Sequence, residues 1–546
     1  MTSPRRIVVL GGGITGLTAA YTLAQARRGG APIEELLIEA SDRLGGHLRT
    51  ERVAGYVIEA GPDSFLAEKP EAAALCRELG LGDQLIGSND AERRTYILHH
   101  GRLVPLPDGL MFLVPTRLWP TLWSPLLSFR SKAAILTELF TPRPNSHGFE
   151  SAGLKPGATP GAAPGATAET DDPTSQDESV ADFVRRHFGD SMLENIADPL
   201  LAGVYGGDSA CLSVRAVLPR FWEMEQKYGS LGRGVLAARR QQRLRAAGSS
   251  GTSTGAEPAG LASRHPSEIP DAAGSAWTSK QISKQTGPLF MSLKDGLGRL
   301  VDALASRLET SRVRLGQRVL SIERGDNNGE GAEGKPPGGN YLVRCAGAAY
   351  AADALILALP TYEGGRLLAP FDPRLGELLG GIPYTSALTV ALGYDAASVR
   401  NLPPGFGFLV PHKENRRMLA CTFVHHKFRH RVAPGKALLR CFLGGARDAG
   451  ILTLDDDSIV DIIRSEILDI MNIDADPELC RVHRWPASMP QYSPGHRERV
   501  KLMGARADAL PGIFLAGNAY SGIGISDCVR TGRAAAEQAL RKMRGE

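Results

Sequence analysis

The chain has 546 residues, of which 42% are hydrophobic and 22% are charged. This is the composition of a globular protein with several domains and large buried cores. Its 63 basic and 59 acidic residues give a formal net charge of +4. That balance is too even to indicate nucleic-acid binding, so we expect no nucleic-acid partner. The seven cysteines are scattered without a Cys-x-x-Cys pair, which argues against a disulfide framework and a zinc site, so we expect free thiols and no metal.

The first sixty residues are typical of a β-α-β unit. An apolar strand over 7–10 leads through a glycine turn into a helix over 14–26, and a second strand follows over 35–39. Strands joined in this way pair in parallel with a right-handed crossover. No secretory signal precedes the first strand, and no run of 18 apolar residues could span a bilayer. We therefore expect a cytoplasmic protein that is at most peripheral on the inner face of the membrane.

A spaced set of glycines follows the first strand. Gly11 permits a tight turn, Gly13 lets the backbone approach a pyrophosphate, and Gly16 lets the helix pack closely on the sheet. The N-terminus of the helix adds free N–H groups and a partial positive charge. Glu39 ends the second strand, 23 positions after Gly16, where a carboxylate can accept from ribose hydroxyls. Together these residues predict a dinucleotide site, and a purely structural turn is the alternative.

A second glycine pair, Gly45 and Gly46, follows Glu39 and lets the backbone pass close to the same ligand. Arg43 and His47 lie beside this pair and offer positive charge to phosphates. A nicotinamide dinucleotide does not require the second pair, whereas an extended flavin dinucleotide has a use for it. The alternative for Arg43 is a solvated turn.

The segment 103–127 is rich in Leu, Trp, Phe and Pro, and its five prolines exclude one long helix. Trp119 and Trp123, near Arg117, suit a membrane interface, and a buried substrate wall explains the composition equally well. The spacing of apolar residues predicts a helix within 71–90. Three stretches rich in Pro, Gly and small polar residues are interpreted as low-complexity surface insertions: 143–178, 247–287 and 325–340.

The C-terminal half alternates strand and helix patterns. We expect strands at 313–323, 341–346, 354–359 and 513–516, an antiparallel sheet within 384–445, and helices at 458–471 and 524–541. The last of these helices follows a glycine-rich turn, so its N-terminal dipole faces whatever lies in the turn.

Several longer motifs resemble a known family. Residues 39–50 match the FAD-binding signature of the flavin amine oxidase superfamily. The segments 59–65, 106–109, 198–208 and 517–528 look like those of the oxygen-dependent porphyrinogen oxidases of haem synthesis. The resemblance covers the whole chain except the three low-complexity insertions.

The resemblance implies a non-covalently bound FAD, with Cys528 a free thiol. In addition to Arg43 and Gly46, it places these residues on the cofactor: Gly11, Gly12, Gly13, Ile14, Thr15, Gly16, Glu39, Ala40, His47, Gly61, Pro62, Asp63, Ser64, Val319, Trp485, Asn518, Ile523, Gly524 and Ile525. Core packing is the alternative for Trp485.

The resemblance further implies that a porphyrinogen, protoporphyrinogen IX or coproporphyrinogen III, loses six electrons to three O₂, which become three H₂O₂. We expect Arg94 to bind a propionate, with a solvated surface arginine as its alternative. Phe406 and Phe408 are candidates to stack on the macrocycle, and core packing explains them equally well. No residue is assigned as a catalytic acid or base. A homodimer and delivery of the product to a haem-pathway chelatase are further expectations.

The predicted fold class is α/β, or α+β overall, with a Rossmann-like FAD-binding domain, a mixed-sheet substrate domain and a helical, membrane-facing domain. Their expected extents are 1–88, 289–360 and 486–546 for the first, 89–102 and 361–485 for the second, and 103–246 for the third.

Two other functions remain open. A flavin amine or polyamine oxidase would need an aromatic cage and a lysine near the flavin, and no lysine lies in a matching sequence context. A non-enzymatic escort protein of the same architecture would have lost flavin chemistry, whereas here Glu39 and the C-terminal glycine turn are intact.

Overall fold

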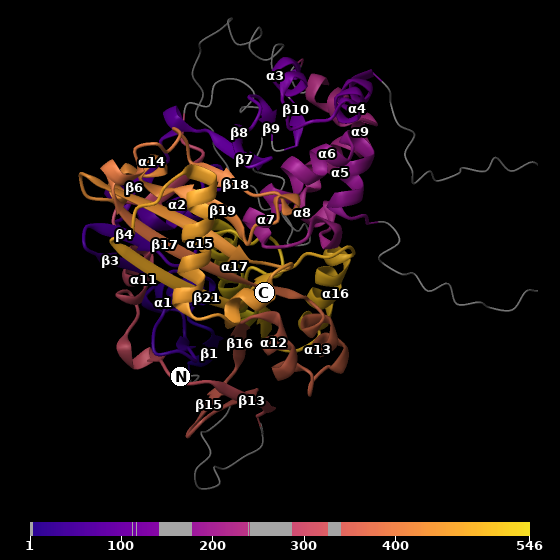
Figure 1. Ribbon diagram of the computed structural model, residues 1–546. Helices are drawn as coiled ribbons and strands as arrows, with labels where there is room; N and C mark the ends of the chain where they lie inside the picture. Colours follow the sequence, from indigo (N-terminus) through magenta and orange to yellow (C-terminus); the bar gives the residue numbers. More distant parts are fainter. Residues whose placement is uncertain are drawn as a thin grey trace, which may run out of the picture.

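The computed structural model describes residues 4–111, 113–115, 117–140, 177–237, 240, 287–325 and 340–545. The three predicted low-complexity insertions therefore lie outside the described residues, apart from their edges. The chain forms a parallel sheet, a large mixed sheet and a group of helices (Figure 1). The helices of this group gather at one end of the molecule, and a small antiparallel sheet lies at the other.

The parallel sheet carries the N-terminal β-α-β unit, which confirms the expected pairing. Val9 in β1 pairs with Leu37 on one side and with Ile356 on the other, both in parallel. The five strands, in spatial order, are β12 (Val313–Arg314), β2 (Ile33–Ile38), β1 (Arg5–Leu10), β16 (Ala354–Leu357) and β22 (Ile513–Leu515). The three central strands, β2, β1 and β16, are largely buried on both faces, as is typical of a parallel sheet covered on both sides.

Alternate side chains of β1 point into two different cores. Ile7 and Val9 face helices, whereas Val8 and Leu10 face the opposite layer. The helices on the first face are α1 (Ile14–Arg28), α2 (Pro70–Glu78), α11 (Gly298–Ala305) and α17 (Ile525–Arg544). The second face is covered by β13 (Val319–Arg324), β14 (Tyr341–Cys345), β15 (Ala348–Ala352), α12 (Thr361–Leu368), α13 (Pro373–Gly380) and α16 (His496–Asp508).

The mixed sheet has seven strands, and only β18 and β7 pair in parallel. In spatial order the strands are β21 (Leu479–Pro490), β17 (Tyr384–Asp395), β20 (Lys436–Gly444), β19 (Met418–Phe423), β18 (Gly407–Leu409), β7 (Thr95–His99) and β8 (Arg102–Pro105). Helix α15 (Asp456–Met471) packs on one face. The opposite face carries Thr389 and Arg440, whose sequence neighbours point toward α15.

The helical group has its own core, and its segments come from both sides of residues 141–176. It contains α3 (Leu118–Trp123), α4 (Phe129–Phe140), α5 (Val180–Phe188), α6 (Asp190–Met192), α7 (Asp198–Tyr205), α8 (Val214–Val217) and α9 (Pro219–Tyr228). The hairpin of β9 (Leu110–Met111) and β10 (Val114–Pro115) precedes α3. As expected from the prolines, 103–127 forms short elements and not one helix.

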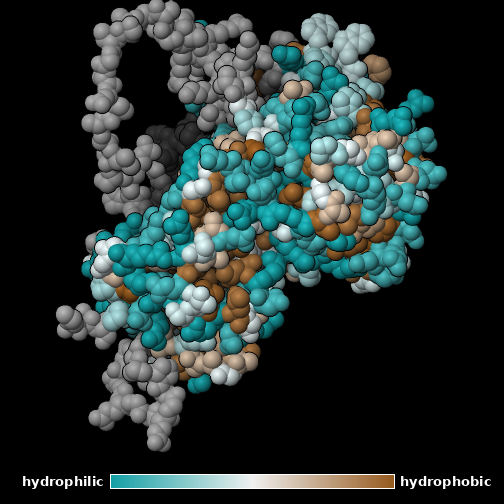
Figure 2. All heavy atoms as spheres, turned by 90° about the vertical axis from the view of Figure 1, so that its left-hand side faces the viewer, coloured by the Kyte–Doolittle hydropathy of each residue, from teal (hydrophilic) through white to brown (hydrophobic). Residues whose placement is uncertain are grey.

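The face of the molecule in Figure 2 is mainly polar, with hydrophobic residues gathered in patches. The most exposed large hydrophobic side chains of the described residues lie in and just after α3, where Trp119, Trp123 and Phe129 are 73%, 79% and 89% exposed. A buried substrate wall is therefore wrong for the two tryptophans, although Leu126 and Leu127 of the same segment lie in the core. Within the described residues, no helix is long and apolar enough to cross a bilayer.

Two sequence expectations change in detail. The helix expected within 71–90 ends at Glu78, and residues 85–87 form β6 (Leu85–Gly87). The strand expected over 313–323 is two strands of different sheets, because the chain turns at Gly316, where φ is +66°. Helices α12 and α13 lie within the expected substrate domain but pack on the parallel sheet, and the domain limits themselves stay a prediction.

Two small sheets complete the fold. The strands β3 (Thr50–Val53) and β4 (Tyr56–Glu59) form a hairpin. The strands β5 (Phe65–Leu66) and β6 both pair with β11 (Phe290–Leu293), which brings the end of the first 90 residues back beside the chain that follows residue 287.

Candidate functional site

The glycine turn before α1 has the shape that the sequence predicts. Gly11 has a φ of +102°, and a Cβ atom on Gly16 would lie 1.8 Å from the carbonyl oxygen of Gly11. A Cβ on Gly13 would meet nothing within 4 Å among the described residues. The open side of Gly13 lies at the N-terminus of α1, whose first N–H groups have no capping side chain in the part of the chain that the structure describes. This is the geometry of an anion site at a helix N-terminus.

The second glycine pair lies directly against the first turn. Gly13 forms a bridge with Gly45, and a Cβ on Gly46 would lie 3.1 Å from the Cα of Gly13. The guanidinium of Arg43 donates to the carbonyl oxygens of Leu44 and Gly46, at 3.2 and 2.5 Å. Burial, and then the charge of Arg49, lower the pKa of Arg43. Arg43 therefore holds this turn as well as adding positive charge to it.

The carboxylate of Glu39 lies at the end of β2, beside the turn. Its Oε2 accepts from the N–H of Gly12 at 2.5 Å, and its Oε1 accepts from the N–H and hydroxyl of Ser41 at 2.8 and 2.7 Å. The side chain is half-buried, and the neighbouring Ala40 is exposed. The expected ribose acceptor thus also fixes the glycine turn.

The segment from Glu59 to Ser64 is held by side chains of the mixed sheet. The carbonyl oxygen of Ala60 accepts from the hydroxyl of Thr389 at 2.7 Å and from Nε1 of Trp485 at 2.8 Å. Arg440 donates to the carbonyl oxygen of Gly61. A Cβ on Gly61 would lie 2.0 Å from the carbonyl oxygen of His47, so the segment also lies tightly against the second glycine pair.

Trp485 links the two halves of the site. Its half-buried ring lies edge-on to His47, with ring centres 5.2 Å apart, in addition to its bond to Ala60. This position combines packing with a place beside two segments that the sequence assigns to the cofactor.

The C-terminal glycine turn closes the same region. The hydroxyl of Tyr492 donates to the carbonyl oxygen of Asn518 at 2.6 Å and accepts from the N–H of Gly522 at 2.9 Å. Helix α17 then begins at Ile525, and its Asp527 forms a buried ion pair with Lys69 at 2.6 Å. That pair joins the chain that follows Ser64 to the N-terminus of α17.

Other residues assigned to the cofactor have side chains that serve the fold. Ile14 and Ile525 belong to the core on the α1 face, and Val319 belongs to the core on the other face of the sheet. Thr15 packs where α1 and α17 cross, since a Cβ on Gly532 would lie 2.3 Å from its carbonyl oxygen. If these residues contact a ligand, they do so mainly through their backbone.

The remaining three differ in exposure. Pro62 and Gly524 are exposed, and Ile523 packs against the core of the helical group. Ile523 thus connects the C-terminal glycine turn with that group.

The three candidate substrate residues lie in neighbouring segments but differ in exposure: Arg94 is exposed, whereas Phe406 and Phe408 are buried. The N–H of Phe406 donates to the carbonyl oxygen of Arg94 at 2.8 Å. The side chain of Arg94 is exposed, and the structure gives its guanidinium no partner among the described residues. Phe408 is 1% exposed, in the core beneath α15 and opposite the face that carries Thr389 and Arg440. This position favours the packing alternative for Phe408.

Sequence reasoning missed the side chains that hold the segment 59–64. Lys427 of α14 (Val424–Lys427) donates to Asp63 and Ser64, Arg431 pairs with Glu59, and Arg440 reaches Gly61. No motif marks them, because their role depends on contacts with residues more than 360 positions away. The one signal is the alternation in β20, where Arg440 interrupts an apolar strand.

All seven cysteines are free. Cys528 is buried in the first turn of α17, and burial raises its pKa to about 11. This thiol is therefore protonated and a poor nucleophile at neutral pH.

The parallel sheet, the glycine turn at the N-terminus of α1 and the carboxylate after β2 together have the arrangement that is typical of dinucleotide-binding folds. A model of the family described as flavin containing amine oxidoreductases matches residues 14–540. The chain belongs to this family and is a flavin-dependent oxidoreductase.

Three relatives show where the chain lies in the family. Coproporphyrinogen III oxidase of Bacillus subtilis (strain 168) is 31% identical over 98% of both chains. Protoporphyrinogen oxidase 1 of Arabidopsis thaliana chloroplasts is 26% identical over 96% of this chain and 85% of its own. A crystal structure from Exiguobacterium sp. 255-15, assigned as a protoporphyrinogen oxidase, has a TM-score of 0.75 and 27% identity over 99% of this chain and 100% of its own. These findings confirm the family resemblance and the fold class.

Proposed function

We propose that this protein oxidises a porphyrinogen to the porphyrin in haem biosynthesis. The balanced reaction is porphyrinogen + 3 O₂ → porphyrin + 3 H₂O₂, in which the macrocycle loses six electrons and six protons. The observation that carries the proposal is the 31% identity, over 98% of both chains, to a coproporphyrinogen III oxidase. The chloroplast relative named for protoporphyrinogen is 26% identical and the Exiguobacterium structure 27% identical, so it is the higher identity to the Bacillus subtilis enzyme that favours coproporphyrinogen III as the substrate.

The cofactor we propose is FAD, bound without a covalent link. When bound, the flavin accepts electrons from the substrate and passes them to O₂. The open space at Gly13 and the carboxylate of Glu39 fit the pyrophosphate and the ribose of a dinucleotide. The second glycine pair and the segment 61–64 continue the site toward α17. The buried, protonated Cys528 supports non-covalent binding.

The chain's own residues hold and orient the reactants. The mixed sheet fixes the segment 59–64 through Thr389, Trp485 and Arg440, and Tyr492 shapes the turn before α17. We assign no general base, because an aromatic product makes the loss of hydrogen from a porphyrinogen favourable. Arg94, whose exposed guanidinium has no partner among the described residues, offers its charge to a carboxylate of the substrate.

Arg94→Ala should raise KM about two- to fivefold and leave kcat nearly unchanged. The reason is that an exposed ion pair contributes roughly 0.2–1 kcal/mol and acts on binding alone. Steady-state porphyrin fluorescence measures both constants. Arg93→Ala is the matched control, because Arg93 is an exposed neighbour that already lies 3.7 Å from Asp90. Equal kinetics for Arg94→Ala and wild type would remove Arg94 from the site.

The experiment that tests the function incubates the purified protein with each porphyrinogen in air. Porphyrin fluorescence should rise, three equivalents of peroxide should form per porphyrin, and both should stop without O₂. A protein that oxidises neither porphyrinogen, but oxidises an amine, would establish the amine oxidase alternative instead. A correctly folded protein that retains no flavin would favour the escort alternative.

We also propose a cytoplasmic protein that contacts the inner face of the membrane through α3 and the start of α4. Trp119, Trp123 and Phe129 are exposed there, and the described residues 117–137 contain three cations and no carboxylate. Aromatic rings and cations together favour an anionic membrane surface. Delivery of the porphyrin to a chelatase, and a homodimer, remain proposals.

Replacing both Trp119 and Trp123 by serine should reduce binding to phosphatidylglycerol vesicles at least about tenfold, because each buried indole contributes more than 1 kcal/mol. Co-sedimentation measures the bound fraction. Tyr362→Ser is the control, since Tyr362 is an exposed aromatic residue on α12. Wild-type protein that does not sediment with these vesicles would contradict the proposed contact.

A further inference from the structure

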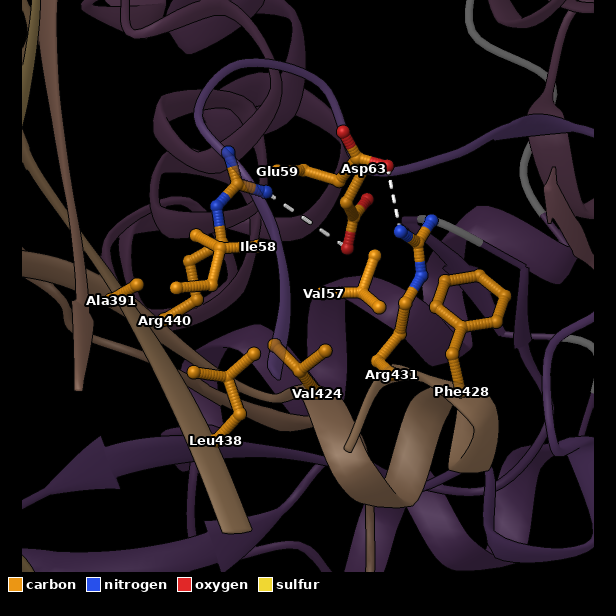
Figure 3. Close-up of a pocket in the computed structure, with 10 residues that line it drawn as sticks. All are labelled: Val57, Ile58, Glu59, Asp63, Ala391, Val424, Phe428, Arg431, Leu438 and Arg440. Carbon is orange, nitrogen blue, oxygen red and sulfur yellow. Dashed lines mark hydrogen bonds and ion pairs between the residues drawn. The ribbon is translucent and has the colours of Figure 1, made fainter. Parts of the chain in front are cut away.

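A cluster of five ionisable side chains lies behind the segment 61–64. Two are carboxylates, Glu59 and Asp63, and three are cations, Lys427, Arg431 and Arg440 (Figure 3, which omits Lys427). Arg431 and Arg440 approach the two carboxylates from opposite sides. The pairs are Arg431 with Glu59 at 2.8 Å and Arg440 with Asp63 at 3.9 Å.

Two of the cations hold the backbone and side chains of the segment directly. The Nζ of Lys427 donates to both oxygens of Asp63, at 3.1 and 3.0 Å, and to the hydroxyl of Ser64 at 3.1 Å. Arg440 donates to the carbonyl oxygen of Gly61. Every residue of the segment except Pro62 therefore meets a cation from the mixed sheet or from α14.

The cluster carries one positive charge more than its carboxylates neutralise. No side chain in it is more than 16% exposed. Burial lowers the pKa of Lys427 and of Arg440. Burial also acts to raise the pKa of Asp63, but the charges of Lys427 and Arg440 outweigh it and hold that pKa well below its usual range. Asp63 is therefore ionised, and three cations face two carboxylates in the cluster.

Little inside the cluster can screen this charge. The Nε of Arg440 is buried and has no hydrogen-bond partner among the described residues. The adjoining cavity, lined by Asp63, Glu59 and both arginines, has a volume of about 10 Å³, which is room for one water molecule (Figure 3). An uncompensated charge in such surroundings stabilises a nearby anion more strongly than it would in water.

We propose that Lys427 and Arg440 are positioning residues for the flavin: they fix the segment Gly61–Ser64, and their uncompensated positive charge favours the reduced cofactor. A flavin that takes up two electrons and one proton gains one negative charge, so the cluster stabilises the reduced form relative to the oxidised form. This inference rests on the flavin of the proposed function and adds the residues that set its redox equilibrium.

The test measures the midpoint potential of the bound flavin in three variants, by dye-coupled reduction without any porphyrinogen. Lys427→Gln and Arg440→Gln each remove the excess charge and should lower the ratio of reduced to oxidised flavin about tenfold. For a two-electron couple this is about 30 mV toward more negative potential. Asp63→Asn adds to the excess charge and should shift the potential in the opposite direction. The affinity for sulfite, which binds oxidised flavin as an anion, should change with the same signs.

Opposite signs separate an electrostatic role from a structural one. If the residues only hold the segment, all three variants should shift the potential the same way or not at all, and the proposal would be overturned. Lys436→Gln is the matched control, because Lys436 lies on β20, the strand of Arg440, but pairs with Glu478 away from the cluster. The midpoint potential of the flavin in this variant should equal the wild-type value. If one cation variant does not fold, the other and Asp63→Asn still decide the sign.

The same measurements distinguish this inference from the function on which it rests. Wild-type protein that binds flavin, gives the expected signs and oxidises no porphyrinogen would contradict the function but not the inference. Wild-type protein that retains no flavin would contradict both.

Discussion

Gly16→Ala should destabilise the flavin-free protein by about 3 kcal/mol or more. The new methyl carbon would lie 1.8 Å from the carbonyl oxygen of Gly11, and backbone atoms between β1 and α1 cannot move apart without breaking their packing. The midpoint of urea unfolding, measured on apoprotein, reports this cost without any contribution from the ligand.

Gly13→Ala provides the contrast in the same turn. A Cβ on Gly13 would meet nothing within 4 Å among the described residues, and the φ of −68° at Gly13 suits alanine. The free energy of unfolding of the apoprotein should therefore lie within about 0.5 kcal/mol of the wild-type value. Binding of FAD should nevertheless weaken, because the methyl group occupies the space where the pyrophosphate is expected. Normal FAD affinity in Gly13→Ala would show that the dinucleotide lies elsewhere.

Glu39→Ala should raise the dissociation constant of FAD about 10- to 100-fold. The carboxylate accepts from Gly12 and is placed to accept from the ribose, and a hydrogen bond to a charged group contributes roughly 1.5–3 kcal/mol. Quenching of flavin fluorescence on titration into apoprotein measures the constant.

Two variants control this result. Glu34→Ala removes another acid from β2, one that faces Arg6 at 3.7 Å, and should bind FAD as wild type does. Glu39→Gln keeps an acceptor oxygen and should lie between wild type and Glu39→Ala. Full FAD occupancy in purified Glu39→Ala would remove Glu39 from the proposed ribose contact.

Local chemistry explains which parts of the fold the sequence could predict. The unit from Ile7 to Glu39 combines two short apolar strands, a helix between them and a characteristic glycine spacing, and few other structures share this combination. The observed β1, α1 and β2 agree closely with the elements predicted there. The helix α15 was equally clear, since its apolar residues recur at helical spacing. The strand expected across Gly316 was wrong because one glycine turn sends the chain into a different sheet.

The electrostatics of the site could not be predicted in the same way. Lys427 and Arg440 meet Asp63 and Gly61 only after the mixed sheet has formed, and neither lies in a motif. The surroundings of Phe406 and Phe408 could not be predicted for a related reason. Their spacing did not reveal which face of the sheet a ring would occupy, and packing beneath α15 determines it for Phe408.

Helix α14 has a consequence for any attempt to re-engineer this enzyme. Its Lys427 holds Asp63, while the neighbouring His426 contacts the carbonyl oxygen of Gly405 at 3.2 Å, immediately before Phe406. One short helix thus connects the segment 61–64 to the chain at Phe406, which leads into β18. Mutagenesis libraries aimed at 405–431 to broaden selectivity should therefore yield many variants that purify with little bound flavin. Changes at the exposed Arg94, whose guanidinium has no partner among the described residues, should alter selectivity without this loss of flavin.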